Sequence, residues 1–249
     1  MYVGTLSTSI GGKVKQVTIV VPTYNEEGNI PYLIERIDKT LMPFKSIGYA
    51  YDIQFVDDNS QDKTVEVIRH CAKAYPVAVS VRLKERGLAT AVLQGIRLAK
   101  GLIIGVMDAD LQHPPEVLNR LLVSIDNGAD LAVASRYVYG GGCPEWSMLR
   151  KIISRGAMKI AHTCLPETRH IHDPMSGFFM FRREYVDGVK FEPIGYKILL
   201  EMLVMCKFRH VSEVPFVFED RSSGRSKMKV RQQLDYLRHV HSLIHRSVR

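Results

Sequence analysis

The sequence is poor in cysteine, with four in 249 residues, and no two of them form a short Cys-x-x-Cys pair. That spacing excludes the common structural zinc and dithiol redox motifs as well as a dense disulfide framework. No signal-peptide pattern precedes the cysteines, so we expect reduced, mostly buried thiols in a cytosolic compartment. The cysteines are Cys71, Cys143, Cys164 and Cys206.

Long apolar runs and an acidic excess are also missing. No uninterrupted apolar stretch reaches the roughly 18 to 20 residues that a bilayer span requires, so we expect none of these residues to cross a membrane. Lysine and arginine outnumber aspartate and glutamate by 34 to 26, which gives a formal charge of +8. This excess favours phosphates, acidic lipid or nucleic acid as partners. Nucleic acid is the least favoured, because the sequence contains no recognisable reader motif or exposed aromatic platform.

What the sequence does contain is a regular alternation of short β-branched runs and helical patterns. Its length and its 46% hydrophobic content suit one α/β domain. The pattern predicts a mostly parallel, Rossmann-like sheet flanked by helices, with ligands at the carboxyl ends of the strands. The predicted strands span residues 17–22, 52–57, 77–82, 102–107 and 131–135, and the predicted helices span residues 31–41, 62–75, 87–100 and 115–127.

The two ends of the chain have a different character from the middle. Residues 1–16 are rich in Gly, Ser and Thr and predict a flexible tail before a catalytic domain over residues 17–227. Residues 228–249 predict a basic amphipathic helix that lies on a membrane surface. Its expected apolar face, at helical spacing, comprises Val230, Leu234, Leu237, Val240 and Ile244.

Three of the predicted strands are followed by polar clusters. In Asp108-Ala-Asp110, alternate carboxylates after a buried strand suit a divalent ion such as Mg²⁺ or Mn²⁺ that bridges a diphosphate. Gln112 adds a neutral oxygen two residues further on. An acidic turn exposed to solvent is the plainer interpretation of this tripeptide alone.

A second cluster, Asp57-Asp-Asn-Ser60, follows the second strand. Two adjacent carboxylates at the end of a buried strand need a ligand, metal or cation to satisfy them, which favours a role for Asp57 and Asp58 in accepting hydrogen bonds from the base or ribose of a nucleotide. The alternative is a turn formed by Asp, Asn and Ser for purely local reasons.

Taken together, the motifs resemble those of the inverting family 2 glycosyltransferases of GT-A fold, and within them the dolichyl-phosphate mannose synthases. The resemblance runs from about residue 17 to about residue 243. It is carried by Val21-Pro-Thr-Tyr-Asn-Glu26, Val56-Asp-Asp-Asn-Ser60, Met107-Asp-Ala-Asp-Leu-Gln-His-Pro-Pro-Glu116, Ser135-Arg-Tyr137, Asp173-Pro-Met-Ser-Gly-Phe178 and residues 221–227.

The resemblance implies a role for each matching position. The donor nucleotide sugar would be bound by Pro22, Tyr24, Glu26, Val56, Asp58, Asp108, Ala109 and Lys227. The metal would be bound by Asp108, Asp110 and Gln112. The acceptor phosphate would be bound by Arg136, Arg150, Ser154 and Arg221. Catalysis itself would depend on Asp110, Arg136 and Arg221.

The resemblance also implies substrates: GDP-mannose as donor, dolichyl or another polyprenyl phosphate as acceptor, and Mg²⁺ or Mn²⁺ as cofactor. We expect a peripheral enzyme on the cytoplasmic face of a membrane, with a membrane-anchoring subunit as a further partner to be tested. Two alternatives stay open from the sequence: a UDP-glucose-dependent polyprenyl-phosphate glucosyltransferase, and an inactive nucleotide-sugar-binding subunit of a membrane complex.

Three further positions have weaker patterns. His113 follows Gln112, but Pro114 and Pro115 favour a helix start that turns the imidazole away from a metal. Asp173 is interpreted as a structural turn residue, with direct contact to the sugar as the alternative. The glycine-rich segment 140–146 is a candidate for a loop that closes over the site.

Overall fold

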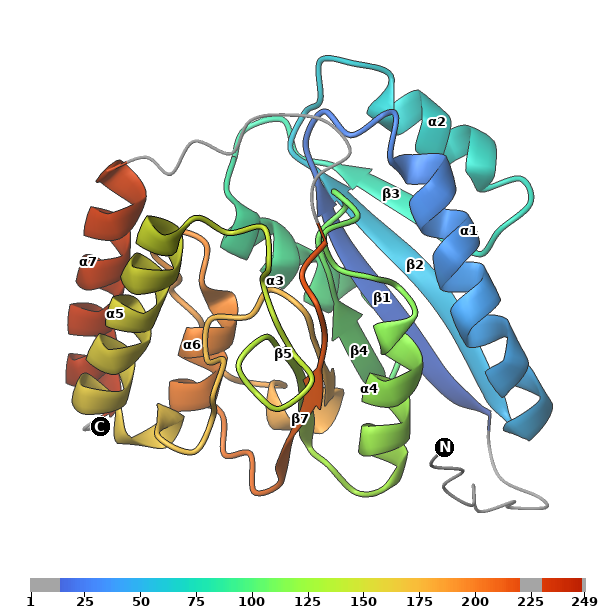
Figure 1. The fold of residues 1–249 in the computed structure, drawn as a ribbon. Helices are drawn as coiled ribbons and strands as arrows, with labels where there is room; N and C mark the ends of the chain where they lie inside the picture. The colour runs from blue at the N-terminus through green and yellow to red at the C-terminus, as the bar shows by residue number, and fades with distance from the viewer. Residues whose placement is uncertain (1–13, 220–229, 248–249) are drawn as a thin grey trace.

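The structure is a computed structural model and describes residues 14–219 and 230–247. These residues form one seven-stranded sheet with helices on both faces (Figure 1). The strands are β1 (Lys15–Thr23), β2 (Tyr49–Asp57), β3 (Val77–Val81), β4 (Ile103–Val106), β5 (Leu131–Ser135), β6 (Phe179–Arg182) and β7 (Val211–Pro215).

The strand order is β3-β2-β1-β4-β6-β5-β7. The strands β1, β2, β3 and β4 are all parallel, whereas β6 runs antiparallel to both of its neighbours, β4 and β5. The chain proceeds outward from β1 to β3 and then returns to place β4 on the other side of β1. The gap between β1 and β4 is therefore a topological switch point, where open α/β sheets bind their ligands.

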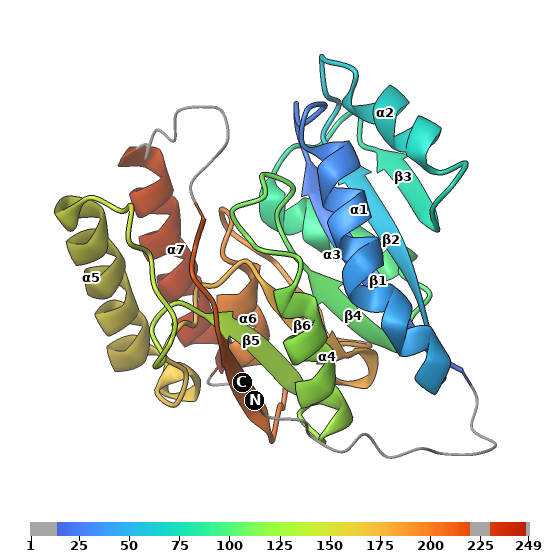
Figure 2. The ribbon, with the colours of Figure 1, turned by 45° about the vertical axis from the view of Figure 1, so that its right-hand side comes forward.

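Alternate side chains of β1 point into two different cores, as the two-residue period of a strand requires. Ile19 and Val21 belong to the core shared with α1 (Ile30–Leu41), α2 (Thr64–Cys71) and α4 (Val117–Asp126). Val20 belongs to the core on the opposite face, shared with α3 (Leu88–Leu98) and α6 (Ile198–Met205). Figure 2 shows the helices of the first group in front of the sheet.

Close contact between α3 and the sheet depends on a glycine. A Cβ atom at Gly95 would lie 2.2 Å from Cγ1 of Val20, so a larger residue would force the helix away from β1. Because α3 starts directly after the loop that follows β3, its position also fixes one wall of the ligand-binding edge.

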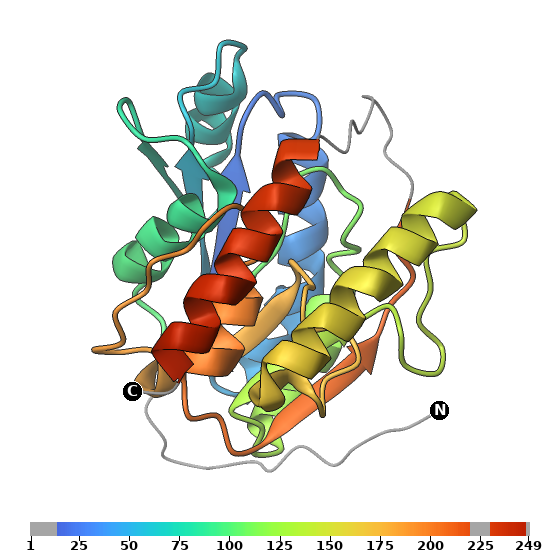
Figure 3. The ribbon, with the colours of Figure 1, turned by 90° about the vertical axis from the view of Figure 1, so that its left-hand side faces the viewer.

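Two long helices lie outside this three-layer body. The helices α5 (Met148–Cys164) and α7 (Val230–Ser247) share a third, smaller core with α6 and run side by side (Figure 3). The centre of this core includes Ala161, Leu200 and Tyr236. The remaining elements are the short 3-10 segments η1 (Met42–Ile47), η2 (Pro166–Thr168) and η3 (Arg183–Tyr185).

The predicted α/β architecture is confirmed, with differences at several boundaries. The strand β1 begins at Lys15, inside the segment predicted as a tail. The helix α2 ends at Cys71 instead of residue 75, because residues 72–75 form turns that lead into β3. Neither the reversed strand β6 nor the helix α6 was predicted.

The prediction that the cysteines are mostly buried was wrong. Only Cys206 is buried among the four free cysteines, and the other three are half-buried. The predicted apolar face of the C-terminal helix is divided: Val240 is buried, but Leu234 and Leu237 are about half exposed, at 50% and 48%. Packing of α7 against both α5 and α6 rotates the helix so that Tyr236 and Leu243 point inward instead. None of the helices in residues 14–219 and 230–247 has the length and apolar character of a membrane span.

Candidate active site

The polar clusters after β1 (Pro22-Thr-Tyr-Asn-Glu26), β2 (Asp57-Asp-Asn-Ser60) and β4 (Asp108-Ala-Asp-Leu-Gln112) lie together at the carboxyl edge of the sheet. Each contains one residue in the left-handed backbone region. These residues are Asn25 (φ 58°), Asn59 (φ 60°) and Leu111 (φ 62°). Asparagine adopts this conformation readily, but leucine does so rarely and at a cost of about 1 kcal/mol or more. Leu111 directly follows Asp108-Ala-Asp110, so the strained residue lies in the turn that presents these carboxylates. Strain of this kind persists where the surrounding structure holds the backbone, and it is common at functional sites.

A cavity of about 250 Å³ opens at the switch point between β1 and β4. It is lined by the loop after β1, by the start of α3 and by the loop after β4. The lining residues are Pro22, Thr23, Tyr24, Glu26, Asp58, Leu88, Asp108, Ala109 and Asp110. All of them except Thr23, Leu88 and Asp110 were assigned to the donor by resemblance, so the cavity contains six of the eight residues in that assignment. We call this space the donor cavity.

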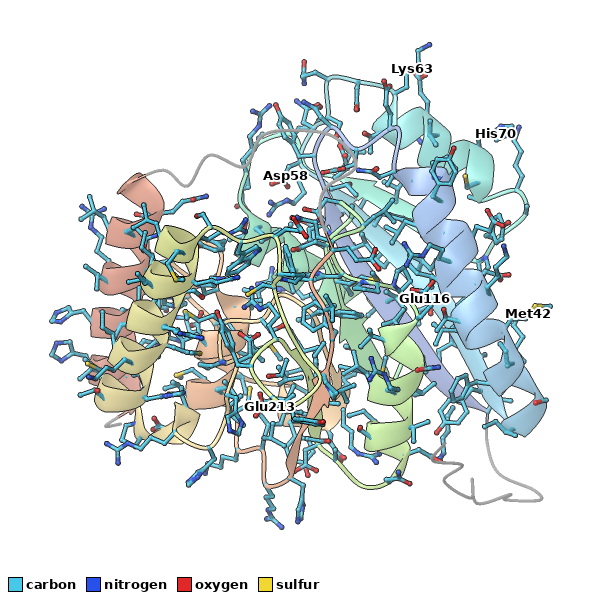
Figure 4. All side chains as sticks on the ribbon, in the orientation of Figure 1. Met42, Asp58, Lys63, His70, Glu116 and Glu213 are labelled. Atoms are coloured by element: carbon cyan, nitrogen blue, oxygen red, sulfur yellow. The ribbon has the colours of Figure 1, made fainter. Side chains whose placement is uncertain are left out.

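Asp58 has an internal partner that the sequence did not reveal. Its Oδ1 accepts a hydrogen bond of 2.6 Å from Nε of Arg82, and its Oδ2 accepts one of 2.8 Å from the amide of Gly87. Arg82 is itself buried, with 3% of its side chain exposed. Arg82 is thus the cation that makes burial of Asp58 tolerable, and Asp58 in turn fixes the start of α3 at the upper end of the sheet (Figure 4).

Asp57 has a purely local role. It accepts hydrogen bonds from the Thr23 hydroxyl at 3.1 Å and from the backbone amide of Ser60 at 2.8 Å. These contacts tie the end of β1 to the loop after β2, so the turn interpretation is confirmed for Asp57.

The carboxylates of Asp108 and Asp110 face both the donor cavity and a second cavity beside it. The Nε2 of Gln112 donates to the Glu219 carbonyl at 3.2 Å, which fixes the plane of the amide. Within the described residues, no three His, Cys, Asp or Glu side chains come close enough to hold an ion by themselves. Two carboxylates that share their ion with substrate phosphates and water suit Mg²⁺ or Mn²⁺, so the residues present fit such a metal.

His113 is not placed as a metal ligand. Its Nδ1 accepts a hydrogen bond of 3.1 Å from the Asp108 amide, and its ring stacks on Phe178 at 5.2 Å between centroids. Burial lowers the pKa of this imidazole to about 4. His113 therefore stays neutral near pH 7 and accepts a hydrogen bond from the Asp108 backbone. The sequence predicted an imidazole that turns away from a metal, and in the structure the ring packs in the core against Phe178.

The second cavity, of about 270 Å³, lies between the loop after β4 and the two outer helices. Arg136, Arg150 and Ser154 line it, so three of the four residues assigned to the acceptor phosphate come together. Its deeper walls are more apolar and come from α5 and α7, including Ile153, Ala157 and Tyr236. We call this space the acceptor cavity, and Leu88, Asp108 and Asp110 form the wall that it shares with the donor cavity.

Arg136 is held in a fixed orientation by Asp173. Nε and Nη2 of Arg136 both donate to the Asp173 carboxylate at 2.7 Å, and the backbone amide of Arg136 donates to it at 3.1 Å. Burial lowers the pKa of Arg136, but the Asp173 charge outweighs this and raises the pKa overall. Asp173 is completely buried, so it is the counter-ion of Arg136 and not a simple turn residue.

Glu213 on β7 (Figure 4) supports this pair from below, because its carboxylate accepts hydrogen bonds from the backbone amides of His172 and Asp173.

Arg150 is oriented by an aromatic side chain. Its guanidinium lies 3.9 Å from the ring centroid of Trp146, and the Arg136 guanidinium lies 5.1 Å from the same ring. Such a cation–π contact holds a guanidinium group in place and leaves its N–H donors available. Ser154 accepts a hydrogen bond of 2.8 Å from the Tyr137 hydroxyl. The predicted loop 140–146 thus contributes a side chain to the cavity wall, while closure of that loop stays a prediction.

Lys197 is a cavity residue that the sequence analysis missed. It precedes α6, lines the acceptor cavity, and donates one hydrogen bond of 3.0 Å to the Met175 carbonyl. Burial, and then the nearby charge of Arg136, lowers its pKa to about 8. The segment around it contains no recognisable motif, and the only signal is a lysine set in an otherwise apolar stretch.

Among the predicted site residues that the structure describes, Val56 lies in neither cavity. Val56 is completely buried inside the sheet and does not line the donor cavity. Arg221 and Lys227 lie outside the described residues, so their predicted roles stay predictions.

An α/β fold with two cavities that share a wall is typical of an enzyme that brings two substrates together. Comparison with known families identifies which class of enzyme this is. Residues 18–189 match the family model described as glycosyl transferase family 2, and the chain belongs to that family.

Within that family, the similar curated proteins are dolichol-phosphate mannosyltransferases. The chain is 47% identical to the one from Pyrococcus furiosus over 229 residues, which cover 92% of this chain and 64% of that protein. It is 36% identical to the one from Saccharomyces cerevisiae, covering 92% of this chain and 86% of that protein. A third, from Mycosarcoma maydis, is 34% identical and covers 90% and 77%, respectively. The resemblance drawn from the motifs is confirmed.

Solved structures support the fold. Glucosyl-3-phosphoglycerate synthase from Mycobacterium tuberculosis, in complex with Mn²⁺, uridine diphosphate and its product, aligns with a TM-score of 0.66 at 17% identity. The alignment covers 94% of this chain and 80% of that one. A complex of the same enzyme with Mg²⁺ and uridine diphosphate aligns with a TM-score of 0.64, at 17% identity over 94% and 79% of the two chains. The predicted GT-A fold is thereby confirmed.

Proposed function

We propose that this chain transfers mannose from GDP-mannose to the phosphate of dolichyl phosphate, with inversion at the anomeric carbon. The observation that carries the proposal is the common wall of the two cavities. A donor bound against Pro22 and Tyr24 and an acceptor bound against Arg136 and Arg150 would meet at Asp108 and Asp110. The names of the three similar curated proteins supply the sugar and the lipid.

The acceptor needs no strong base in the protein. A phosphate monoester has its second pKa near 6, so at neutral pH it is already an anionic nucleophile. One of its oxygens attacks the anomeric carbon, the bond from that carbon to the β-phosphate oxygen breaks, and GDP leaves. His113 is buried, neutral and hydrogen-bonded to the backbone, which agrees with a mechanism that uses no imidazole base.

The protein's task is to hold two anions together in the correct orientation. Arg136, fixed by Asp173, and Arg150, fixed by Trp146, present guanidinium groups whose geometry does not have to reorganise when the acceptor arrives. Mg²⁺ or Mn²⁺, when held by Asp108 and Asp110 with the Gln112 amide nearby, supplies charge neutralisation for the leaving diphosphate.

We place the membrane surface against the outer helices. The first half of α5 exposes Met148, Leu149 and Ile152 at 72%, 66% and 59%, and α7 exposes Leu234 and Leu237. These two helices also form the apolar walls of the acceptor cavity. An acceptor lipid would therefore pass between helices whose outer sides are apolar, which supports a peripheral location at a membrane surface. The cytoplasmic face is the one that we propose.

The test is a transfer assay with purified protein, Mn²⁺ or Mg²⁺, dolichyl phosphate in detergent, and radiolabelled GDP-mannose or UDP-glucose in parallel reactions. We expect label in the lipid phase from GDP-mannose only, and none after chelation of the metal. Label in the lipid phase from UDP-glucose alone would show that the transferred sugar is glucose and not mannose. Donor binding without transfer, also in the presence of native membranes, would identify a nucleotide-sugar-binding subunit instead.

A further inference from the structure

Lys197 occupies an unfavourable position for a cation. It is the residue directly before α6, at the positive end of the helix dipole. Burial and the nearby guanidinium charges, of which Arg136 has the larger effect, lower the pKa of its ammonium group, and the Asp173 and Asp108 carboxylates offset this only in part. A structural lysine would normally avoid all three of these conditions.

Its hydrogen bonding is also incomplete. An ammonium group carries three donors, and in the part of the chain that the structure describes the Nζ of Lys197 uses one of them, toward the Met175 carbonyl. Nζ also lies 4.6 Å from the ring centroid of Tyr196, a cation–π contact that stabilises the charge but supplies no oxygen or nitrogen acceptor. Donors that stay unused on a partly buried charge are costly unless a ligand accepts from them. Because Lys197 lines the acceptor cavity, a ligand in that cavity can reach these donors.

The charges around the cavity indicate which kind of ligand this is. Asp108 and Asp110 are assigned to the metal ion, so the other described charged groups, apart from Lys197, are the Arg136 and Arg150 guanidinium groups and the Asp173 carboxylate. Asp173 already neutralises Arg136 through two hydrogen bonds. The one guanidinium charge left over is smaller than the charge of a phosphate monoester, about −1.5 to −2 at pH 7.

We propose that the ammonium group of Lys197 donates hydrogen bonds to the acceptor phosphate, as a third cation beside Arg136 and Arg150. The inference rests on the proposed function for the identity of that phosphate. Lys197 lines the acceptor cavity and not the donor cavity, so its contribution concerns the lipid substrate and not the nucleotide.

The experiment compares Lys197→Met and Lys197→Arg with a matched control, Lys207→Met. Lys207 is exposed beyond the other end of α6, and its replacement removes the same charge. Initial rates are measured with a short-chain, water-soluble prenyl phosphate so that membrane binding does not enter. A lost charged hydrogen bond corresponds to a change of roughly tenfold or more in affinity.

We expect Lys197→Met to raise KM for the prenyl phosphate about tenfold while KM for GDP-mannose stays within about twofold. Lys197→Arg should recover part of the loss, and Lys207→Met should match the wild type. An unchanged acceptor KM in Lys197→Met would overturn the proposal, and so would an equal rise in both KM values or a loss explained by a lower Tm.

Calorimetric binding of the same prenyl phosphate, without any donor, separates this proposal from the proposed function. If the wild type binds the prenyl phosphate and Lys197→Met binds it about tenfold more weakly, the Lys197 proposal holds even where transfer from GDP-mannose fails. Equal binding by the two proteins would overturn it, whatever the donor proves to be.

Discussion

Arg136 and Asp173 form a buried, bidentate ion pair in which both hydrogen bonds measure 2.7 Å and Asp173 has no exposed surface. The pair joins the end of β5 to the loop before β6 and leaves the outer part of the guanidinium facing the acceptor cavity. Under the proposed function, orientation of the acceptor phosphate would therefore depend on a carboxylate that does not line the cavity.

Replacement of Asp173 by asparagine should affect both stability and transfer. It keeps the side-chain volume but leaves the Arg136 charge without its partner, so we expect the free energy of unfolding to fall by about 3 to 5 kcal/mol. Urea unfolding measures this change. The control is Asp187→Asn, whose exposed carboxylate lies 3.8 Å from Arg183. That change should stay below about 1 kcal/mol, and equal effects of the two variants would contradict the role of Asp173.

Replacement of Asp110 by asparagine should remove metal-dependent donor binding. Asp110 faces both cavities, and its loss leaves one carboxylate for a divalent ion. We expect Mn²⁺-dependent binding of GDP, measured by calorimetry, to disappear and transfer to fall at least about 100-fold. Addition of EDTA to the wild type should have the same effect. Asp187→Asn again serves as the control, and wild-type GDP binding by Asp110→Asn would show that the metal is held elsewhere.

His113 should make the metal-free protein less stable in acid. Burial lowers its pKa from 6.5 to about 4, so between these values the unfolded chain binds a proton that the folded chain does not. Stability is therefore greatest above pH 6.5 and falls as the pH drops to about 4, by about 3 kcal/mol from this group. His113→Gln should reduce this loss of stability, measured as the free energy of unfolding in denaturant at a series of pH values. The same change at the exposed His241 should leave it unaltered, and parallel curves for His113→Gln and wild type would be the contrary outcome.

The exposed apolar side chains of α5 should govern membrane binding. Burial of a leucine side chain contributes about 1.5 to 3 kcal/mol, so Leu149→Glu should weaken binding to phospholipid vesicles about tenfold or more in a flotation assay. The matched control is Leu102→Glu, because Leu102 is equally exposed, at 70%, but lies next to β4. A larger effect at Leu102 than at Leu149 would place the membrane surface on another side of the molecule.

The sequence predicted the first half of the sheet better than the second for a physical reason. Strands such as β1 and β2 are short β-branched runs between clear helical patterns, and their periodicity is local. The strand β6 runs antiparallel between β4 and β5. Its direction depends on pairing with distant strands, which no local pattern encodes. The divided apolar face of α7 has the same origin, since contact with two helices decides which side of α7 is buried.

The same limit applies to the site. Asp108, Asp110 and Arg136 belong to short motifs, and the resemblance placed them correctly at the cavities. Their supporting residues were not predicted: Arg82 behind Asp58, Asp173 behind Arg136, and Lys197 beside them. A counter-ion is chosen by three-dimensional proximity, so one sequence does not show which of many charged residues will fill that place.

The order of the two cavities along the chain also has a consequence for how the molecule assembles. The donor cavity is formed by residues 22–110, all from the first half of the chain. The acceptor cavity requires residues as late as Tyr236. Because a ribosome releases the amino-terminal part of a chain first, every residue of the donor cavity emerges before the helices that complete the acceptor cavity.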